Sequence, residues 1–164
     1  MQAEADLVLG DRTPMPEDLT RLPYTRAIVQ ETLRPPAWTI GRQSIRDCEI
    51  GGQHIPAGSI VLVSQWVTHH DPRFYADPLE FRPERWDEIE GSPFPRYAFF
   101  PFGGGSRSCI GEHFAMTETI AVLSMITRRW QVLPINEDLA KPQPSVTLRS
   151  RSGIPLQVER RNIQ

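Results

Sequence analysis

Two segments of the chain carry apolar residues at helical spacing. In residues 22–34 they return every three or four positions, which predicts a helix with one buried face. In residues 111–129 they cover much of the circumference, so a helix there should be buried on more than one side. Residues 3–9 predict a shorter helix, and residues 16–22 predict one further turn. The chain therefore combines short helices near its start with one long helix in its second half.

Strand-like runs lie between these helices and again near the end of the chain. Residues 39–63 contain short β-type runs separated by Gly51-Gly52 and by Pro56-Ala57-Gly58, which are typical turn sequences. Residues 146–158 alternate apolar and polar positions around Ser152-Gly153, so we expect a tail hairpin there. Together with the helices, these runs predict an α+β fold that is mainly helical.

Proline divides the chain into many short pieces. The 16 prolines are spread along the sequence rather than gathered in one tract, which indicates short elements joined by ordered connections. They are frequent in residues 71–101, where we expect a long irregular loop. A loop of this length inside a compact domain usually has a function.

Composition excludes several classes of protein. The 164 residues are 39% hydrophobic and 23% charged, which suits one domain with a core rather than a disordered chain. A net charge of −2 provides no basic field for nucleic acid. The two cysteines, Cys48 and Cys109, lie too far apart for a cysteine-rich zinc site. Residues 1–11 suit neither a signal peptide nor a membrane span, so we expect no membrane segment in this chain and a cytoplasmic location.

Candidate chemistry is concentrated in residues 100–111, which read FPFGGGSRSCIG. Cys109 lies just ahead of the predicted long helix, where free N–H groups and the helix dipole favour a thiolate. Gly103, Gly104 and Gly105 would let the backbone pass close to a large flat group. Arg107 adds a fixed positive charge near the sulfur.

Three interpretations of this cysteine are open. A buried structural cysteine in a glycine-rich turn is the usual fate of a lone cysteine. A phosphate loop or a phosphatase-like thiolate disagrees with the spacing, because no G-K-[ST] follows the glycines and no arginine follows Cys109 at a useful distance. The third is a thiolate ligand to haem iron, since a porphyrin fills the coordination positions that one cysteine leaves open.

Three motifs resemble those of the cytochrome P-450 haem-thiolate monooxygenases. Phe102–Gly111 is similar to the cysteine-ligand loop F-x-x-G-x-R-x-C-x-G at every fixed position. Glu31–Arg34 matches the E-x-x-R helix, and Phe81–Trp86 matches the segment F-x-P-E-R-[FW]. The motifs occur in the family's order, and the resemblance extends over the chain. It implies a single partial domain over residues 1–164, the C-terminal portion of that fold, with these parts: E-x-x-R helix 22–34, strands 39–63, irregular loop 71–101, cysteine-ligand loop 102–111, helix 111–129 and tail hairpin 146–158.

The resemblance also implies a cofactor, haem b (iron protoporphyrin IX). Cys109 would be the axial iron ligand, whose electron donation favours O–O cleavage in bound dioxygen. Arg107 and Arg42 would each pair with a haem propionate, a role that suits a guanidinium. The remaining cofactor contacts that the resemblance implies are Phe102, Gly103, Gly111 and Ala115.

Other residues acquire structural or substrate roles from the same resemblance. Glu31 and Arg34 share a helix face, which alone indicates a surface ion pair worth under about 1 kcal/mol. With Arg85 they resemble a buried network that ties the helix to the loop. The family's substrate pocket falls at Ala37, Trp38, Thr39 and Leu148, with core packing as an equal alternative for Trp38.

His69-His70-Asp71 could suggest a metal site. A third ligand at a useful spacing is missing, so we interpret these residues as part of a solvated loop before Pro72.

The predicted function is that of a haem-binding monooxygenase, an oxidoreductase acting on a small organic substrate with dioxygen. Electrons would come from a ferredoxin or a flavoprotein. The family's distal helix, with its acid–alcohol pair, has no counterpart here, so we expect these residues to be inactive alone. Arg34 is followed directly by Pro35, where the family usually has two intervening residues, so we expect a less secure Glu31–Arg34 pair. The alternative is a non-catalytic remnant without stable haem.

Overall fold

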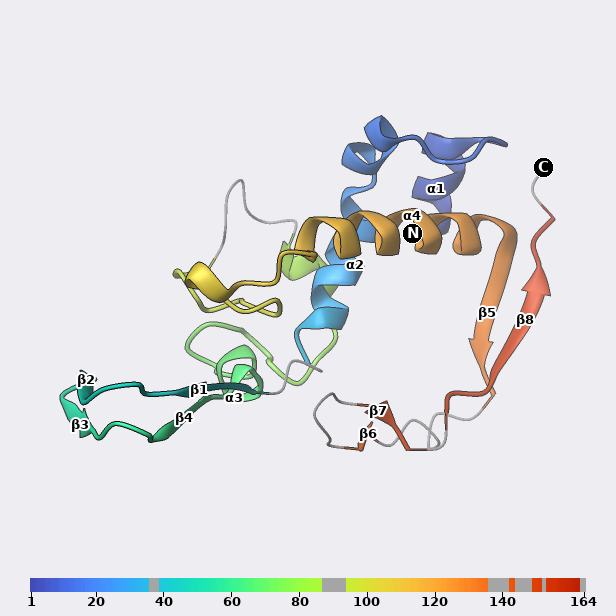
Figure 1. The fold of residues 1–164 in the computed structure, drawn as a ribbon. Coiled ribbons are helices and arrows are strands. Elements are labelled where there is room, and N and C mark those ends of the chain that lie inside the picture. Colours follow the sequence, from blue (N-terminus) through green and yellow to red (C-terminus); the bar gives the residue numbers. More distant parts are fainter. Residues whose placement is uncertain (36–38, 87–93, 136–141, 144–148, 152, 163–164) are drawn as a thin grey trace.

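The computed structural model describes residues 1–35, 39–86, 94–135, 142–143, 149–151 and 153–162. Its elements, drawn in Figure 1, are α1 (Gln2–Leu9), η1 (Pro16–Arg21), α2 (Pro23–Leu33), β1 (Ile40–Gln43), β2 (Cys48–Ile50), β3 (Gln53–Ile55), β4 (Ile60–Val63), α3 (Gln65–His69), η2 (Pro83–Trp86), η3 (Gly105–Arg107), α4 (Glu112–Arg129), β5 (Trp130–Pro134), β6 (Pro142–Gln143), β7 (Arg149–Ser150) and β8 (Leu156–Arg160). The η elements are short 3₁₀ helices.

The core lies where α1, η1 and α2 pack against α4, which crosses the other helices (Figure 1). Its buried side chains are Val8, Leu9, Leu19, Leu22, Val29 and Ile120. Helix α2 begins with Pro23, which suits the first position of a helix, and it ends just before Pro35. The two helices that the sequence predicts over 22–34 and 111–129 are thus present and in contact.

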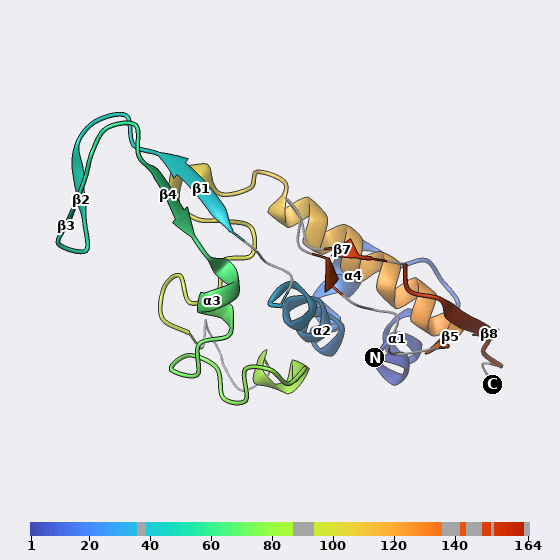
Figure 2. The ribbon, with the colours of Figure 1, turned by 90° about the horizontal axis from the view of Figure 1, so that it is seen from below.

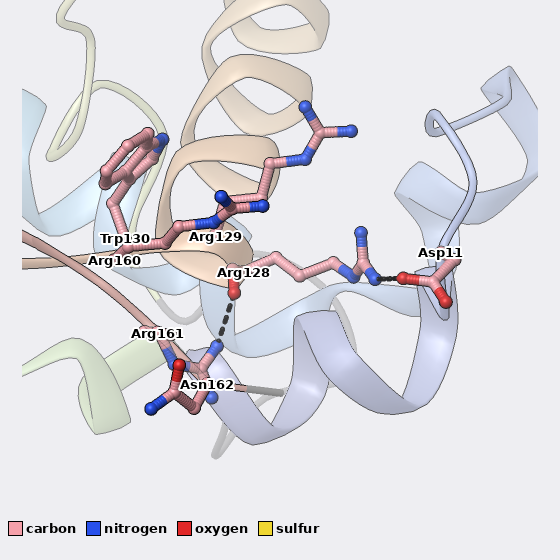
Figure 3. A pocket seen from close by; sticks show the side chains of 7 residues that line it. All are labelled: Asp11, Arg128, Arg129, Trp130, Arg160, Arg161 and Asn162. Atoms are coloured by element: carbon pink, nitrogen blue, oxygen red, sulfur yellow. Dashed lines mark hydrogen bonds and ion pairs between the residues drawn. The ribbon is translucent and has the colours of Figure 1, made fainter. Parts of the chain in front are cut away.

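The end of α4 is capped by Arg161, the residue that follows the last strand, β8. Arg161 donates to the carbonyls of Thr127 (3.0 Å) and Arg128 (2.8 Å), and it pairs with Asp6 of α1 at 2.7 Å. Arg128 pairs in turn with Asp11, as Figure 3 shows. A hollow of about 790 Å³ lies beside these contacts. It is lined by Asp11, Arg128, Arg129, Trp130, Arg160, Arg161 and Asn162. Arg161 thus satisfies carbonyls that a helix end leaves free, and Arg128 ties the segment after α1 to α4.

All four sheets in the described residues are antiparallel pairs. The β1–β4 and β2–β3 pairs form an arm that extends away from the helices, while β5–β8 lies at the far end of α4 (Figures 1 and 2). The arm sits where the sequence predicts strands over residues 39–63.

The tail pairs differently from the predicted hairpin. Residues 146–148 lie outside the described residues, and Leu156–Arg160 forms β8, which pairs along its length with β5. Strand β5 is not predicted from the sequence, because it follows α4 without a turn residue. Alternation also identifies a strand without identifying its partner.

A second missed element is α3. It has only five residues, too few for a helical period to be recognised. Ser64 begins it, with its hydroxyl accepting from the Val67 N–H at 3.3 Å. Helix α3 leads from the β1–β4 arm into the loop that starts at residue 71.

No helix in the described part of the chain combines the length and the apolar content that crossing a bilayer requires.

Candidate functional site

The loop that carries Cys109 folds back on itself through backbone hydrogen bonds. The Gly103 N–H donates to the Phe100 carbonyl (2.9 Å), and the Cys109 N–H donates to the Phe102 carbonyl (2.8 Å). Gly103 and Gly105 have φ angles of 83° and 68°, which residues with a Cβ rarely adopt. The glycines therefore permit the turn that brings Cys109 back beside Phe102.

The Cys109 side chain is exposed and borders a hollow of about 390 Å³. The hollow is lined by Ile40, Arg42, Gln65, Pro101, Phe102, Gly103, Arg107 and Cys109. The interpretation of Cys109 as a buried structural cysteine is therefore wrong. Strand β1 and the glycine-rich loop bring five of the predicted cofactor residues to one place. They are Arg42, Phe102, Gly103, Arg107 and Cys109.

The other two predicted contacts, Gly111 and Ala115, lie at the start of α4. A Cβ added at Gly111 would meet the Cys109 Sγ at 3.7 Å, an ordinary contact distance. The Ala115 N–H donates to the Gly111 carbonyl at 2.8 Å, within the helix backbone. Gly111 thus borders the sulfur, and a cofactor contact for either residue stays a prediction.

Arg42 and Arg107 give the hollow its positive charge. Neither guanidinium forms an ion pair within the described ranges of the chain, although Arg42 donates to the Gly41 carbonyl at 2.8 Å. Two guanidiniums without acids, next to an exposed thiol, suit a ligand that carries carboxylates.

A haem is a ligand of this kind, and the donor set fits it. The thiol can provide the one axial ligand that haem iron takes from a cysteine, while the guanidiniums can pair with propionates. Among the residues that are described, no group of three or more His, Cys, Asp or Glu side chains could hold a bare metal ion. The arrangement therefore suits a metal whose remaining ligands come with a cofactor.

Behind the loop, Glu31 joins two arginines in a buried network. Arg34 donates to both Glu31 oxygens, from Nη2 at 2.7 Å and from Nε at 3.1 Å, and Arg85 Nε lies 3.3 Å from the same carboxylate. All three side chains are buried. The structure thus brings together Glu31, Arg34 and Arg85, the three residues for which the resemblance predicts a buried network. Trp86 adds a fourth contact, from Nε1 at 3.0 Å, which the sequence analysis missed.

The arginines extend this network into the irregular loop. Arg34 Nη1 donates to the Pro78 carbonyl at 2.6 Å, and Arg85 Nη1 donates to the Ala76 carbonyl at 2.8 Å. Burial by itself would raise the pKa of Glu31, but hydrogen bonds from Arg34, the Arg82 N–H and Trp86 hold it below its usual value. The carboxylate therefore stays charged and fixes the loop against α2.

Comparison with known proteins identifies the family. Residues 1–158 match the sequence model of a protein family, which is described as Cytochrome P450. The chain belongs to the cytochrome P450 family. Enzymes of this family are haem-dependent monooxygenases, which agrees with the exposed thiol and the two guanidiniums that share its hollow.

Several curated proteins are similar to most of the chain. Cyclooctatin synthase of Streptomyces melanosporofaciens is 41% identical over 150 residues, which are 90% of this chain and 33% of that protein. Cyclooctat-9-en-7-ol 5-monooxygenase of the same organism is 41% identical over 137 residues, 82% of this chain and 30% of that protein. Taurochenodeoxycholic 6 alpha-hydroxylase of Sus scrofa is 36% identical over 157 residues, 93% of this chain and 31% of that protein. The chain spans about a third of the length of these relatives.

The direct Arg34-Pro35 junction leaves the hydrogen bonds between Arg34 and Glu31 in place. Arg34 keeps helical φ and ψ angles of −69° and −54° as the C-cap of α2. Both of its contacts with Glu31 are present, so the expectation of a less secure pair is wrong. The reason is that carbonyls outside the helix, at Pro78 and at Glu80, also hold the guanidinium.

The prediction that His69 belongs to a solvated loop is wrong. Its side chain is fully buried, with Nδ1 3.0 Å from the Arg34 carbonyl and Nε2 accepting from the Phe100 N–H at 3.1 Å. Burial lowers the pKa of His69 to about 4, so the ring is neutral. A polar His-His-Asp run carries no sequence signal of burial, and only the fold provides these backbone partners.

The predicted substrate-pocket residues are placed only in part. Ala37, Trp38 and Leu148 lie outside the described residues. Thr39 is exposed directly before β1. Its role in a pocket stays a prediction.

Proposed function

We propose that this chain carries the thiolate side of a haem-dependent monooxygenase, with Cys109 as the axial ligand of haem b. The observation that carries the proposal is the exposed Cys109 thiol in one hollow with the guanidiniums of Arg42 and Arg107, neither of which pairs with an acid in the described part of the chain. When bound, the haem would supply dioxygen activation, which a thiolate ligand promotes by electron donation.

The chain's own residues would hold and orient that group. Arg42, from β1, and Arg107, from η3, approach the hollow from different elements, so they can pair with two separate carboxylates. Phe102 adds an apolar wall beside the sulfur. The Cys109 N–H is already bonded to the Phe102 carbonyl, which fixes the backbone that carries the thiolate.

The reaction we propose is oxidation of a small organic substrate by dioxygen, with electrons from a ferredoxin or a flavoprotein. The names of two relatives, a 5-monooxygenase and a 6 alpha-hydroxylase, support this reaction class. The acid–alcohol pair by which the family delivers protons to oxygen has no counterpart in these 164 residues. We therefore propose that the 164 residues by themselves turn over little or no substrate.

The test is the spectrum of the chain after addition of haem, reduction and carbon monoxide. A thiolate ligand should give a red-shifted Soret band, and Cys109→Ser should abolish it, because a neutral hydroxyl is a far weaker donor to iron. Cys48→Ser is the matched control, since Cys48 is also exposed but lies on β2. A chain that binds no haem would favour the alternative, a non-catalytic remnant. A band that survives Cys109→Ser would overturn the ligand assignment.

A further inference from the structure

Both backbone polar groups of Phe100, the residue that begins the cysteine loop, are held by side chains of α3. The Phe100 N–H donates to His69 Nε2 at 3.1 Å, and Gln65 Nε2 donates to the Phe100 carbonyl. The two side chains lie one helical turn apart on α3, so they face the same way. Two side chains of a five-residue helix therefore hold both the N–H and the carbonyl of Phe100.

The histidine can make this contact in only one form. Because the Phe100 N–H donates to Nε2, that nitrogen carries no proton, and the proton of the neutral ring is on Nδ1. Nδ1 then donates to the Arg34 carbonyl at 3.0 Å. The ring also packs against those of Phe99 and Phe100, with its centroid 5.3 Å from each of theirs. His69 thus joins the end of α2 to the start of the loop through two direct hydrogen bonds.

The backbone of Phe100 is connected to that of Cys109 by a short path of covalent and hydrogen bonds. The Gly103 N–H donates to the Phe100 carbonyl, and the Cys109 N–H donates to the carbonyl of Phe102, two residues beyond Phe100. Gln65 also lines the hollow with Cys109. A shift at Phe100 would therefore change where the thiol points.

We infer that His69 and Gln65 are positioning residues for the Cys109 thiolate, acting through the backbone of Phe100. This inference rests on the proposed function, since the purpose of the positioning is ligation of haem iron. Neither side chain needs to touch the cofactor for this role. A residue that only fills space would affect global stability without affecting the loop selectively.

Two substitutions at His69 separate its two hydrogen bonds. His69→Gln keeps an acceptor near the position of Nε2, and His69→Asn keeps a donor near the position of Nδ1. His69→Phe keeps the ring and removes both bonds. Gln65→Met removes the donor to the Phe100 carbonyl and keeps the side-chain length. His70→Phe is the control, because the His70 ring contacts only the Trp66 carbonyl among the hydrogen bonds described for it.

The first measurement is amide hydrogen exchange at Phe100 and Cys109 in the full chain without haem. We expect exchange at Phe100 to accelerate roughly tenfold in His69→Asn, His69→Phe and Gln65→Met, as loss of one buried hydrogen bond implies. His69→Gln and His70→Phe should stay near the parent chain. Equal exchange in His69→Asn and His69→Gln would overturn the inference.

The second measurement is the Soret band of the reduced carbon monoxide complex. His69→Asn and Gln65→Met should move part of the absorbance from the red-shifted band to the shorter-wavelength band of iron without a thiolate. His69→Gln should retain the parent spectrum. If His69→Phe does not fold, the Gln, Asn and Met variants still decide the question. Unchanged spectra in all variants that bind haem would overturn the inference, whatever their exchange rates, because the thiolate would then be held without His69 and Gln65. A failure of haem to bind Cys109 would refute the proposed function, and the exchange data would still test the positioning.

Discussion

Arg34 and His69 exchange hydrogen bonds in both directions. Arg34 Nη1 donates to the His69 carbonyl at 2.9 Å, and the His69 ring donates from Nδ1 to the Arg34 carbonyl at 3.0 Å. Both side chains are buried. This reciprocal pair closes the end of α2 against α3, and it connects the Glu31 network to the loop that carries Cys109.

The neutral state of His69 predicts a pH dependence of stability. Burial lowers its pKa from 6.5 to about 4. Between these values the unfolded chain binds a proton at His69 that the folded chain does not, so stability increases with pH in this window. We expect this group to lower the free energy of unfolding by about 2 kcal/mol between pH 7 and pH 5. Urea unfolding over this range measures it.

A substitution isolates this contribution. His69→Gln removes the titrating ring, so the slope between pH 7 and pH 5 should decrease, while Gln65→Met on the same helix should leave the slope in place. A parent chain whose stability does not change over this range would contradict the prediction.

The Glu31 network predicts a large loss of stability when its carboxylate is removed. Glu31→Gln leaves Arg34 and Arg85 buried without their counter-charge, which costs about 3–5 kcal/mol. Glu118→Gln, at an exposed position of α4, is the control and should stay within about 0.5 kcal/mol of the parent. Denaturant unfolding of the three chains gives the comparison. A cost for Glu31→Gln no greater than that for Glu118→Gln would show that the network does not stabilise the fold.

Much of this arrangement could be predicted from the sequence, and the reasons differ by residue. Glu31 and Arg34 lie three positions apart on a periodic helix, so their shared face follows from local geometry. Arg107 lies two positions from Cys109, but Arg42 joins them only through the resemblance to the family, because no local pattern places a strand beside the glycine loop.

The missed features depend on contacts between distant segments. The burial of His69 requires the Arg34 and Phe100 backbones, which lie more than thirty positions away on either side. The β5–β8 pairing likewise joins residues 130–134 to residues 156–160. Periodicity reports the environment of one segment and carries no information on which distant segment meets it.

The exposed face of α4 predicts self-association of the 164 residues without haem. Val122 and Ile126 are 48% and 40% exposed, and the surface continues through Leu123 to Val132 and Leu156. A contiguous apolar surface of this kind favours aggregation. We expect the double change Val122→Glu and Ile126→Lys to raise the monomer fraction in light scattering.

The matched control for this face is Ile45→Lys. Ile45 is even more exposed but lies on the β-arm, away from α4, so its replacement should leave self-association unchanged. A parent chain that is already a monodisperse monomer with cooperative unfolding would contradict the prediction.

The positions of Arg42 and Arg107 predict that haem retention and haem ligation can be separated. Arg107→Ala and Arg42→Ala each remove one partner for a propionate, so haem should leave the chain roughly tenfold faster, as loss of one charge-assisted hydrogen bond at an exposed site implies. The Soret position of the reduced carbon monoxide complex should not change, because neither guanidinium touches the iron. Transfer of haem to an acceptor apoprotein gives the rate, and the spectrum gives the ligand. Arg46→Ala, at an exposed position between β1 and β2, is the control and should retain haem like the parent. If the rate for Arg107→Ala equals that for Arg46→Ala, Arg107 does not hold a propionate, and a shifted band in Arg107→Ala would mean that this side chain acts on the thiolate itself.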